Sequence, residues 1–225
     1  KLSKKIILSA LCAHFPIQIA EDCSTALLLE RPVFLDSQRS CPGNRVCLCG
    51  TLPKQLSLSD MPKDCLLLMS ADADTEIPET ASVVHLPEGF SLFKAFNILQ
   101  QLFEQYENWD NSVKEAIRSE DSIQTLLDLC LPLFGNPLLL RSSDFYLVAY
   151  SSVVDEQPEL NYLADPDFSF ETLSFCKMDP DFREAAAKKE PFYLPSHLSG
   201  ARELCVNLFR HGHFSKRLIL EEKLC

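Results

Sequence analysis

The stretch SLFKAFNILQQLFEQYENWDNSVKEAIR, residues 91–118, decides the fold because it carries the strongest helical pattern in the chain. Gly89 breaks the chain before it, Ser91 can act as the N-cap, and about 27 residues follow without Pro or Gly. Spacing by four and three gives an apolar stripe, widened by a flanking row: Leu92, Phe96, Leu99, Phe103, Tyr106, Trp109 and Val113. At 1.5 Å per residue the helix is about 40 Å long, more than one face of a small domain needs. We expect residues 91–120 to link two domains or pair two subunits; a long core helix within one subunit is the alternative.

Short apolar runs of strand length precede this helix, at residues 17–20, 32–35, 45–49, 65–69 and 82–86. Several are unbroken rather than alternating, which is typical of strands that are covered on both faces. Residues 1–90 are therefore predicted to form a small α/β domain. Lys4-Lys5 and the apolar run after them imitate a signal peptide, but Leu11 before Cys12 is not small, so we interpret the segment as an amphipathic helix.

Residues 121–225 follow a different pattern. A helix is predicted over about 121–133, strands over 138–140 and 145–150, helical stretches within 155–189, a strand over 192–194, and a hairpin from 202–209 and 216–221. This order is the layout of a GAF- or PAS-like domain, a central antiparallel sheet with helices on one side. The fold class is thus α/β followed by α+β. Because a sheet of this kind needs a closing helix, we expect a further C-terminal part beyond Cys225.

Composition and charge exclude several functions. The net charge is −11 and the pI is near 4.9, so this region should repel DNA rather than bind it. The six glycines match no phosphate-binding spacing, and the chain has no zinc-protease or serine-hydrolase motif. No run approaches the roughly 20 apolar residues that cross a bilayer. We therefore expect a cytoplasmic protein that is not an enzyme, needs no cofactor and does not enter a membrane.

The ten cysteines suggest a metal or redox site as an alternative function. Cys41, Cys47 and Cys49 lie within nine residues and could hold a metal or sense redox state if a turn supplied further ligands. However, Cys47 and Cys49 are one residue apart in a predicted strand, where small apolar packing is the usual function of cysteine. We expect reduced thiols and no metal.

Aromatic and polar residues near the last strands are candidates for a small-molecule pocket, because such pockets favour aromatic walls with a few polar groups. These candidates are Tyr150, Tyr162, Phe175, Tyr193, His197 and Arg202. Ordinary core packing is the competing explanation for each of them.

Residues 84–152 resemble the PucR/CdaR-type bacterial transcription regulators. The matching features are Leu86-Pro87, Leu102-Phe103 with Tyr106 and Trp109, Ile123-Gln124-Thr125-Leu126-Leu127, Gly135-Asn136-Pro137-Leu138, and Asp144-Phe145 leading to Val148-Ala149-Tyr150-Ser151. The closing strands, through Gly212 to Leu220, are similar to the end of the family's GAF-like sheet.

The resemblance implies a signal-sensing region whose small-molecule effector controls a helix-turn-helix module, with DNA bound only through that module, outside these 225 residues. It also implies a homodimer. A GAF- or PAS-like sensor or scaffold from another signalling protein is the alternative.

Overall fold

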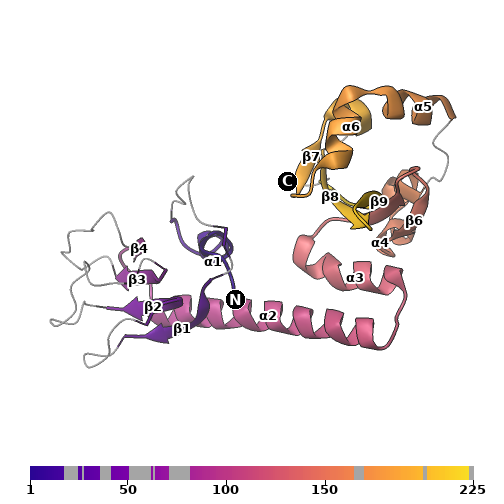
Figure 1. Cartoon of the computed structure of the whole chain (residues 1–225). Helices are drawn as coiled ribbons and strands as arrows, with labels where there is room; N and C mark the ends of the chain where they lie inside the picture. The colour runs from indigo at the N-terminus through magenta and orange to yellow at the C-terminus, as the bar shows by residue number, and fades with distance from the viewer. Residues whose placement is uncertain are drawn as a thin grey trace. The chain divides into compact units, whose positions relative to one another are not determined.

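The computed structural model describes residues 1–17, 25–26, 28–35, 42–50, 62, 64–70, 82–164, 170–199 and 202–222. The chain divides into two compact units, Lys1–Asn108 and Trp109–Cys225. The boundary lies inside one continuous helix, α2 (Leu92–Arg118), which therefore begins in the first unit and ends in the second (Figure 1).

The first unit is a parallel α/β structure, as the unbroken apolar runs predicted. Its elements are α1 (Lys4–Cys12), β1 (Glu30–Phe34), β2 (Arg45–Cys49), β3 (Leu66–Ser70), β4 (Ser82–Leu86) and the first part of α2. The four strands pair in the order β1-β2-β3-β4, and every pair is parallel. The run at 17–20 differs, since Ile17 lies outside any strand and residues 18–20 are not among the described residues.

The core of the first unit lies on the face of this sheet that α1 and α2 cover. Alternate strand residues such as Leu48, Leu66 and Leu68 are buried there, against Leu11 of α1 and Leu99 of α2. The opposite face carries a second buried cluster, formed by the residues between them. Burial on both faces explains why these strands have unbroken apolar sequences.

The N-terminal segment is the amphipathic helix that the sequence predicted. The Ser3 side chain accepts a hydrogen bond from the Ile6 N–H at 3.2 Å and caps α1. Ile7 and Leu11 are fully buried, while His14 is exposed. The helix ends at Cys12, so His14 lies beyond its last turn.

The second unit combines an antiparallel sheet with short helices. After the end of α2 come α3 (Ile123–Phe134), β5 (Leu138–Ser142), β6 (Leu147–Tyr150), α4 (Val153–Glu156), η2 (Pro158–Ala164), α5 (Phe170–Met178), α6 (Pro180–Ala187), β7 (Phe192–Leu194), α7 (Ser196–Ser199), β8 (Glu203–Arg210) and β9 (His213–Glu221). The strand order is β6-β5-β9-β8-β7, so the first and last strands of the unit are neighbours at its centre. The predicted fold class, α/β followed by α+β, is confirmed.

A two-residue turn and a register shift after it determine how β8 pairs with β9. His211 and Gly212 both have positive φ, 51° and 80°, which a two-residue hairpin turn requires. The turn joins β8 to β9, and a register shift between Leu208 and Phe209 then pairs Asn207 with Arg217. Strand β6 starts at Leu147 rather than at Phe145 as predicted. Phe145 has φ 69°, a left-handed conformation that keeps it out of the strand. Its ring stacks on Phe182, with the ring centroids 4.9 Å apart.

Helices α4, η2 and α6 cover one face of this sheet. Their apolar residues Val154, Leu160, Leu163 and Ala185 form a single buried cluster with strand residues from β5, β7, β8 and β9. Alternation along the strands means that every second residue faces this covered side. Residues on the covered side of β5, β8 and β9 therefore come from alternate positions of each strand.

Ser151 fastens the end of β6 to the start of β5. Its fully buried side chain accepts a hydrogen bond from the Leu138 N–H at 3.1 Å. Ser151→Ala leaves that buried N–H without this partner, so we expect a loss of about 1–2 kcal/mol in the free energy of unfolding. Urea denaturation checks this, with Ser152→Ala as the control, because the Ser152 side chain makes no capping hydrogen bond. Equal effects of the two substitutions would contradict it.

Candidate functional site

Charged and polar side chains occupy the covered face of the five-stranded sheet, where apolar residues are the norm. At one register position Glu203 of β8 faces Glu221 of β9. Four residues along β9, Arg217 lies between Asn207 of β8 and Arg141 of β5. The register position between these two is apolar, with Leu139, Cys205 and Ile219. We call Arg141, Glu203, Asn207, Arg217 and Glu221 the inner polar cluster.

Arg217 is the centre of this cluster. It is only 4% exposed, and its guanidinium lies 5.2 Å, 5.3 Å and 5.2 Å from the ring centroids of Phe182, Phe192 and Phe214. Its Nε donates a hydrogen bond to Asn207 Oδ1 at 2.9 Å. Its Nη2 is buried and has no hydrogen-bond partner among the residues that the structure describes. Burial lowers the pKa of Arg217, which is the sign of a cation held away from water.

Asn207 fixes the position of this guanidinium. Its Nδ2 donates to the backbone oxygens of Ala185 at 2.7 Å and Lys188 at 2.9 Å, at the end of α6. Both amide hydrogens are therefore used, and Oδ1 must face Arg217. The contact joins the polar cluster directly to the last turn of helix α6.

The acidic end of the cluster holds two carboxylates that face each other. Glu221 is 3% exposed, and its Oε1 accepts a hydrogen bond from the Tyr162 hydroxyl. Burial and the charge of Glu221 raise the pKa of Glu203 to about 7, against the opposing effect of Arg141 and Arg217. Glu203 is thus partly protonated near neutral pH and can either donate or accept a hydrogen bond.

Arg141 is directed toward backbone carbonyls. Its Nη1 donates to the Phe145 oxygen at 3.1 Å and its Nη2 to the Leu163 oxygen at 3.3 Å. These contacts hold the β5–β6 loop and the end of η2 against the sheet. The pairing of β5 with β9 places Arg141 opposite Arg217 on the neighbouring strand.

The six residues predicted to line a pocket do not form one group. Tyr162 reaches the inner polar cluster through Glu221, and Tyr150 packs against the apolar cluster on the same face. Phe175 is 59% exposed on α5. Alternation along β7 turns Tyr193 to the opposite face of the sheet from Phe192.

Two further predicted residues lie in separate ionic contacts. Arg202 pairs with Glu222 at 3.1 Å and lies 4.6 Å from the ring of Tyr193, whose hydroxyl donates to Glu222 at 2.6 Å. His197 Nε2 lies 3.4 Å from Asp179 and 3.7 Å from Asp181. Asp179 also caps α6 by accepting the N–H of Asp181 and Phe182.

Sequence reasoning missed the residues that form the cluster. Glu203, Asn207, Arg217 and Glu221 each belong to a predicted hairpin strand, and none matches a catalytic motif. The signal that could have found them is period-two alternation: the segments ELCVN at 203–207 and RLILE at 217–221 place polar residues at positions facing the core.

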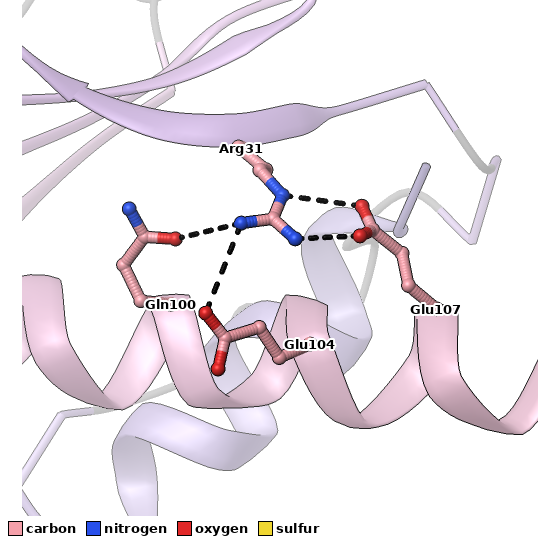
Figure 2. A network of polar contacts seen from close by, with 4 residues as sticks. All are labelled: Arg31, Gln100, Glu104 and Glu107. Carbon is pink, nitrogen blue, oxygen red and sulfur yellow. Dashed lines mark hydrogen bonds and ion pairs between the residues drawn. The ribbon is translucent and has the colours of Figure 1, made fainter.

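The first unit has a polar network of its own, at the contact between β1 and α2. Figure 2 shows Arg31 of β1 donating from Nε and Nη2 to both carboxylate oxygens of Glu107, at 3.2 and 2.5 Å, and from Nη1 to Gln100 at 3.3 Å. Glu104 lies 3.9 Å from the same Nη1. The hydrogen bond and charge of Glu107 raise the pKa of Arg31, and Arg31 lowers the pKa of Glu107.

A hollow of about 310 Å³ adjoins this network, lined by Lys1, Glu30, Arg31, Arg45, Phe103 and Glu107. Each cation in it already has a carboxylate neighbour: Glu107 for Arg31, and Glu30 for Lys1 and Arg45, at 3.2 and 3.5 Å. The lining thus holds three cations and two carboxylates, and Glu30 is shared by Lys1 and Arg45. We interpret this region as a structural contact that attaches α2 to β1.

The predicted linker residues mostly belong to the core of the first unit. Leu99 and Phe103 are buried there, and Leu92, Phe96 and Tyr106 pack against the same cluster. In the second unit, Trp109 and Val113 are half-buried. A dimer through α2 would have to use other positions, such as Phe93 and Ile117, which are 71% and 60% exposed.

Cys47 and Cys49 lie in apolar surroundings. Cys47 and Cys49 share a buried cluster with Leu67 and Met69, and burial raises the pKa of Cys49 to about 11. A thiol with a raised pKa is a poor nucleophile and a poor metal ligand near neutral pH, because both functions need the thiolate. Cys41, the third member of the alternative metal site, lies outside the described residues.

No protein-family model matches this chain, and no curated protein sequence matches it. In the part of the chain that the structure describes, no helix has both the length and the apolar character to cross a bilayer.

Proposed function

We propose that this chain is the non-catalytic, signal-sensing region of a cytoplasmic bacterial transcription regulator of the PucR/CdaR type. The observation that carries the proposal is the continuous helix α2, whose first part packs in the core of one unit and whose last part belongs to the other. In this proposal the shared helix transmits a change in one unit to the other. The resemblance of residues 84–152 to that family supports the assignment.

Apolar and polar contacts both attach α2 to the first unit. Apolar residues hold one side of the helix, and Arg31 reaches Gln100, Glu104 and Glu107, which span two turns of it. Movement of the first part of α2 relative to β1 would break several contacts at once. A small effector that binds one arrangement of the region better than another would shift the balance between them.

The receptor in this proposal is the covered face of the five-stranded sheet. Its inner polar cluster places charged groups among apolar walls, which is the composition of small-molecule sites. Nothing in the cluster pairs a nucleophile with a base, and the thiol of Cys205 has a pKa raised to about 12 by burial. Recognition therefore fits these residues better than catalysis.

DNA binding in this proposal belongs to a module outside these 225 residues, since a region with a net charge of −11 repels phosphate. The intact regulator would act as a homodimer. Its DNA affinity would change when the effector binds here.

A metabolite screen tests the proposal. We expect one compound class to raise the melting temperature by mass action. The same compound should slow hydrogen exchange in α2 as well as in the second unit. A compound that is chemically converted, or one that leaves exchange in α2 unchanged, would speak against a sensing role. In the full-length protein, an effector-dependent change in DNA affinity separates this proposal from a sensor of another signalling pathway.

A further inference from the structure

We propose that Asp179, Asp181 and His197 form a binding site for one divalent transition-metal ion with the ligand preference of zinc. The three residues lie at the start of α6 and in α7, and their donor atoms all lie within 4.8 Å of one another. They are outside the inner polar cluster, and the site does not depend on the proposed function. A bound ion would join two helices of the second unit.

The distances between the donor atoms are the first step of the argument. His197 Nε2 lies 3.4 Å from Asp179 Oδ2 and 3.7 Å from Asp181 Oδ2. A direct charge-assisted hydrogen bond would bring such atoms to about 2.7–2.9 Å. Two donors that each lie about 2.0–2.2 Å from a tetrahedral zinc ion are separated by roughly 3.4 Å. The observed spacing therefore fits a shared ion better than direct ion pairing.

The backbone at the start of α6 positions the two carboxylates. Asp179 is the N-cap, and its Oδ1 accepts hydrogen bonds from the N–H groups of Asp181 at 2.8 Å and Phe182 at 3.2 Å. Oδ2, the other oxygen, is the one that lies toward His197. Pro180 is the first residue of the helix and restricts the backbone between the two aspartates. Ligating carboxylates are commonly held by additional hydrogen bonds of this kind.

The donor set determines the class of ion. Metal ligation requires a neutral imidazole, so the three ligands carry two negative charges in total, which a divalent cation neutralises. Magnesium and calcium prefer ligands that are all oxygen, whereas an imidazole favours zinc and the neighbouring transition metals. The side chains of His197 and Asp181 are 49% and 58% exposed, which gives an ion a path from solvent and leaves a position for a water ligand.

A bound ion would attach α7 to α6. His197 belongs to the four-residue helix α7, which follows β7 after Pro195. At the other end of α6, Ala185 packs in the apolar cluster and Asn207 binds the last turn. An ion at the first turn would therefore stabilise the folded second unit by mass action. We expect zinc to raise its melting temperature.

Zinc chloride and cobalt chloride are the probes. They are added to the 225-residue chain after a chelator has removed bound metal, with the thiols kept reduced by a phosphine. Titration calorimetry gives the stoichiometry and the affinity. We expect one equivalent to bind, and the affinity to fall about tenfold or more in Asp181→Asn and in His197→Gln. His213→Gln is the matched control, because it removes an exposed histidine of the same unit and should bind zinc like the wild type.

Cobalt spectroscopy separates this site from the cysteines. Cobalt held by imidazole and carboxylates gives weak visible bands, whereas a thiolate ligand adds a strong charge-transfer band in the near ultraviolet. We expect the weak bands alone. In nitrogen-15 NMR spectra, the paramagnetic ion should shift or broaden the backbone N–H signals of Asp181, Phe182 and Leu198 before those of residues near the cysteines.

Each outcome decides the question. Failure of zinc and cobalt to bind would mean that His197 and the aspartates form only an ion pair, and the proposal would fall. A thiolate band, an unchanged affinity in both site variants, or equally tight binding of magnesium would overturn it as well, because other groups would then hold the ion. Should a variant fail to fold, the NMR titration of the wild-type protein with cobalt decides. The metabolite screen tests the proposed function separately, so either proposal can fail without the other.

Discussion

Glu203→Gln is expected to stabilise the second unit by about 1–3 kcal/mol at pH near 8 and to leave its stability almost unchanged below pH of about 4.5. Burial and the facing Glu221 raise the pKa of Glu203 from 4.5 to about 7. A rise of this size corresponds to roughly 3 kcal/mol once the carboxyl is ionised. Glutamine keeps the shape of the side chain but removes the charge. It also loses the attraction of Arg141 and Arg217, so we expect less than the full amount.

The direction with pH follows from the two pKa values. Below pH 4.5, the ordinary value, Glu203 is protonated in both the folded and the unfolded chain. Between pH 4.5 and about 7 the unfolded chain releases this proton while the folded chain keeps it, so stability falls as pH rises. Above about pH 7 the full penalty is present. Glutamine removes that penalty, and the gain therefore grows through this window.

Urea denaturation at several pH values measures this gain. Glu156→Gln is the matched control, because Glu156 is an exposed carboxylate of the same unit and should give a flat difference. The titratable groups that interact with Glu203 are Glu221, Arg141, Arg217, Cys205 and Tyr162, and none is altered in either variant. A pH-independent difference for Glu203→Gln would mean that its carboxyl is solvated, and the inner polar cluster would lose its acidic end.

The two sheets could be predicted because their signals are local. Apolar runs of five residues mark buried strands, and the ranges 45–49 and 82–86 coincide with the observed β2 and β4. Likewise Ser122 caps α3, and Gly135 ends it with φ 67°. In each case neighbouring residues in the chain determine the element, so one sequence suffices.

The inner polar cluster is of another kind, since strand pairing creates it. Arg141 and Arg217 are 76 positions apart and meet only because β5 pairs with β9. A sequence pattern can assign a side chain to a face of its own strand, but not to the strand that will lie beside it. The aromatic candidates are dispersed for the same reason: Tyr193 and Phe192 are adjacent in the chain and lie on opposite faces of the sheet.

Leu99→Ala is expected to lower the free energy of unfolding of the first unit by about 3 kcal/mol. Leu99 of α2 is completely buried in the cluster that joins α1, the parallel sheet and α2. The substitution removes apolar contacts and leaves a cavity, because the surrounding strands relax only in part. Alanine favours helix, so the loss comes from packing rather than from helix propensity. Calorimetry or urea denaturation measures it.

Gln101→Ala is the control, because it shortens an exposed side chain two positions away on the same helix and should leave stability nearly unchanged. Leu99→Met, which conserves volume, should cost less than about 1.5 kcal/mol. A loss from Leu99→Ala no larger than that from Gln101→Ala would contradict the packing of α2 in this core. The same experiment bears on signalling. If α2 is the mechanical link, the melting transition of the second unit should move together with that of the first. If the melting transition of the second unit does not change, the two units unfold independently. The helix is then a covalent connection that transmits no signal.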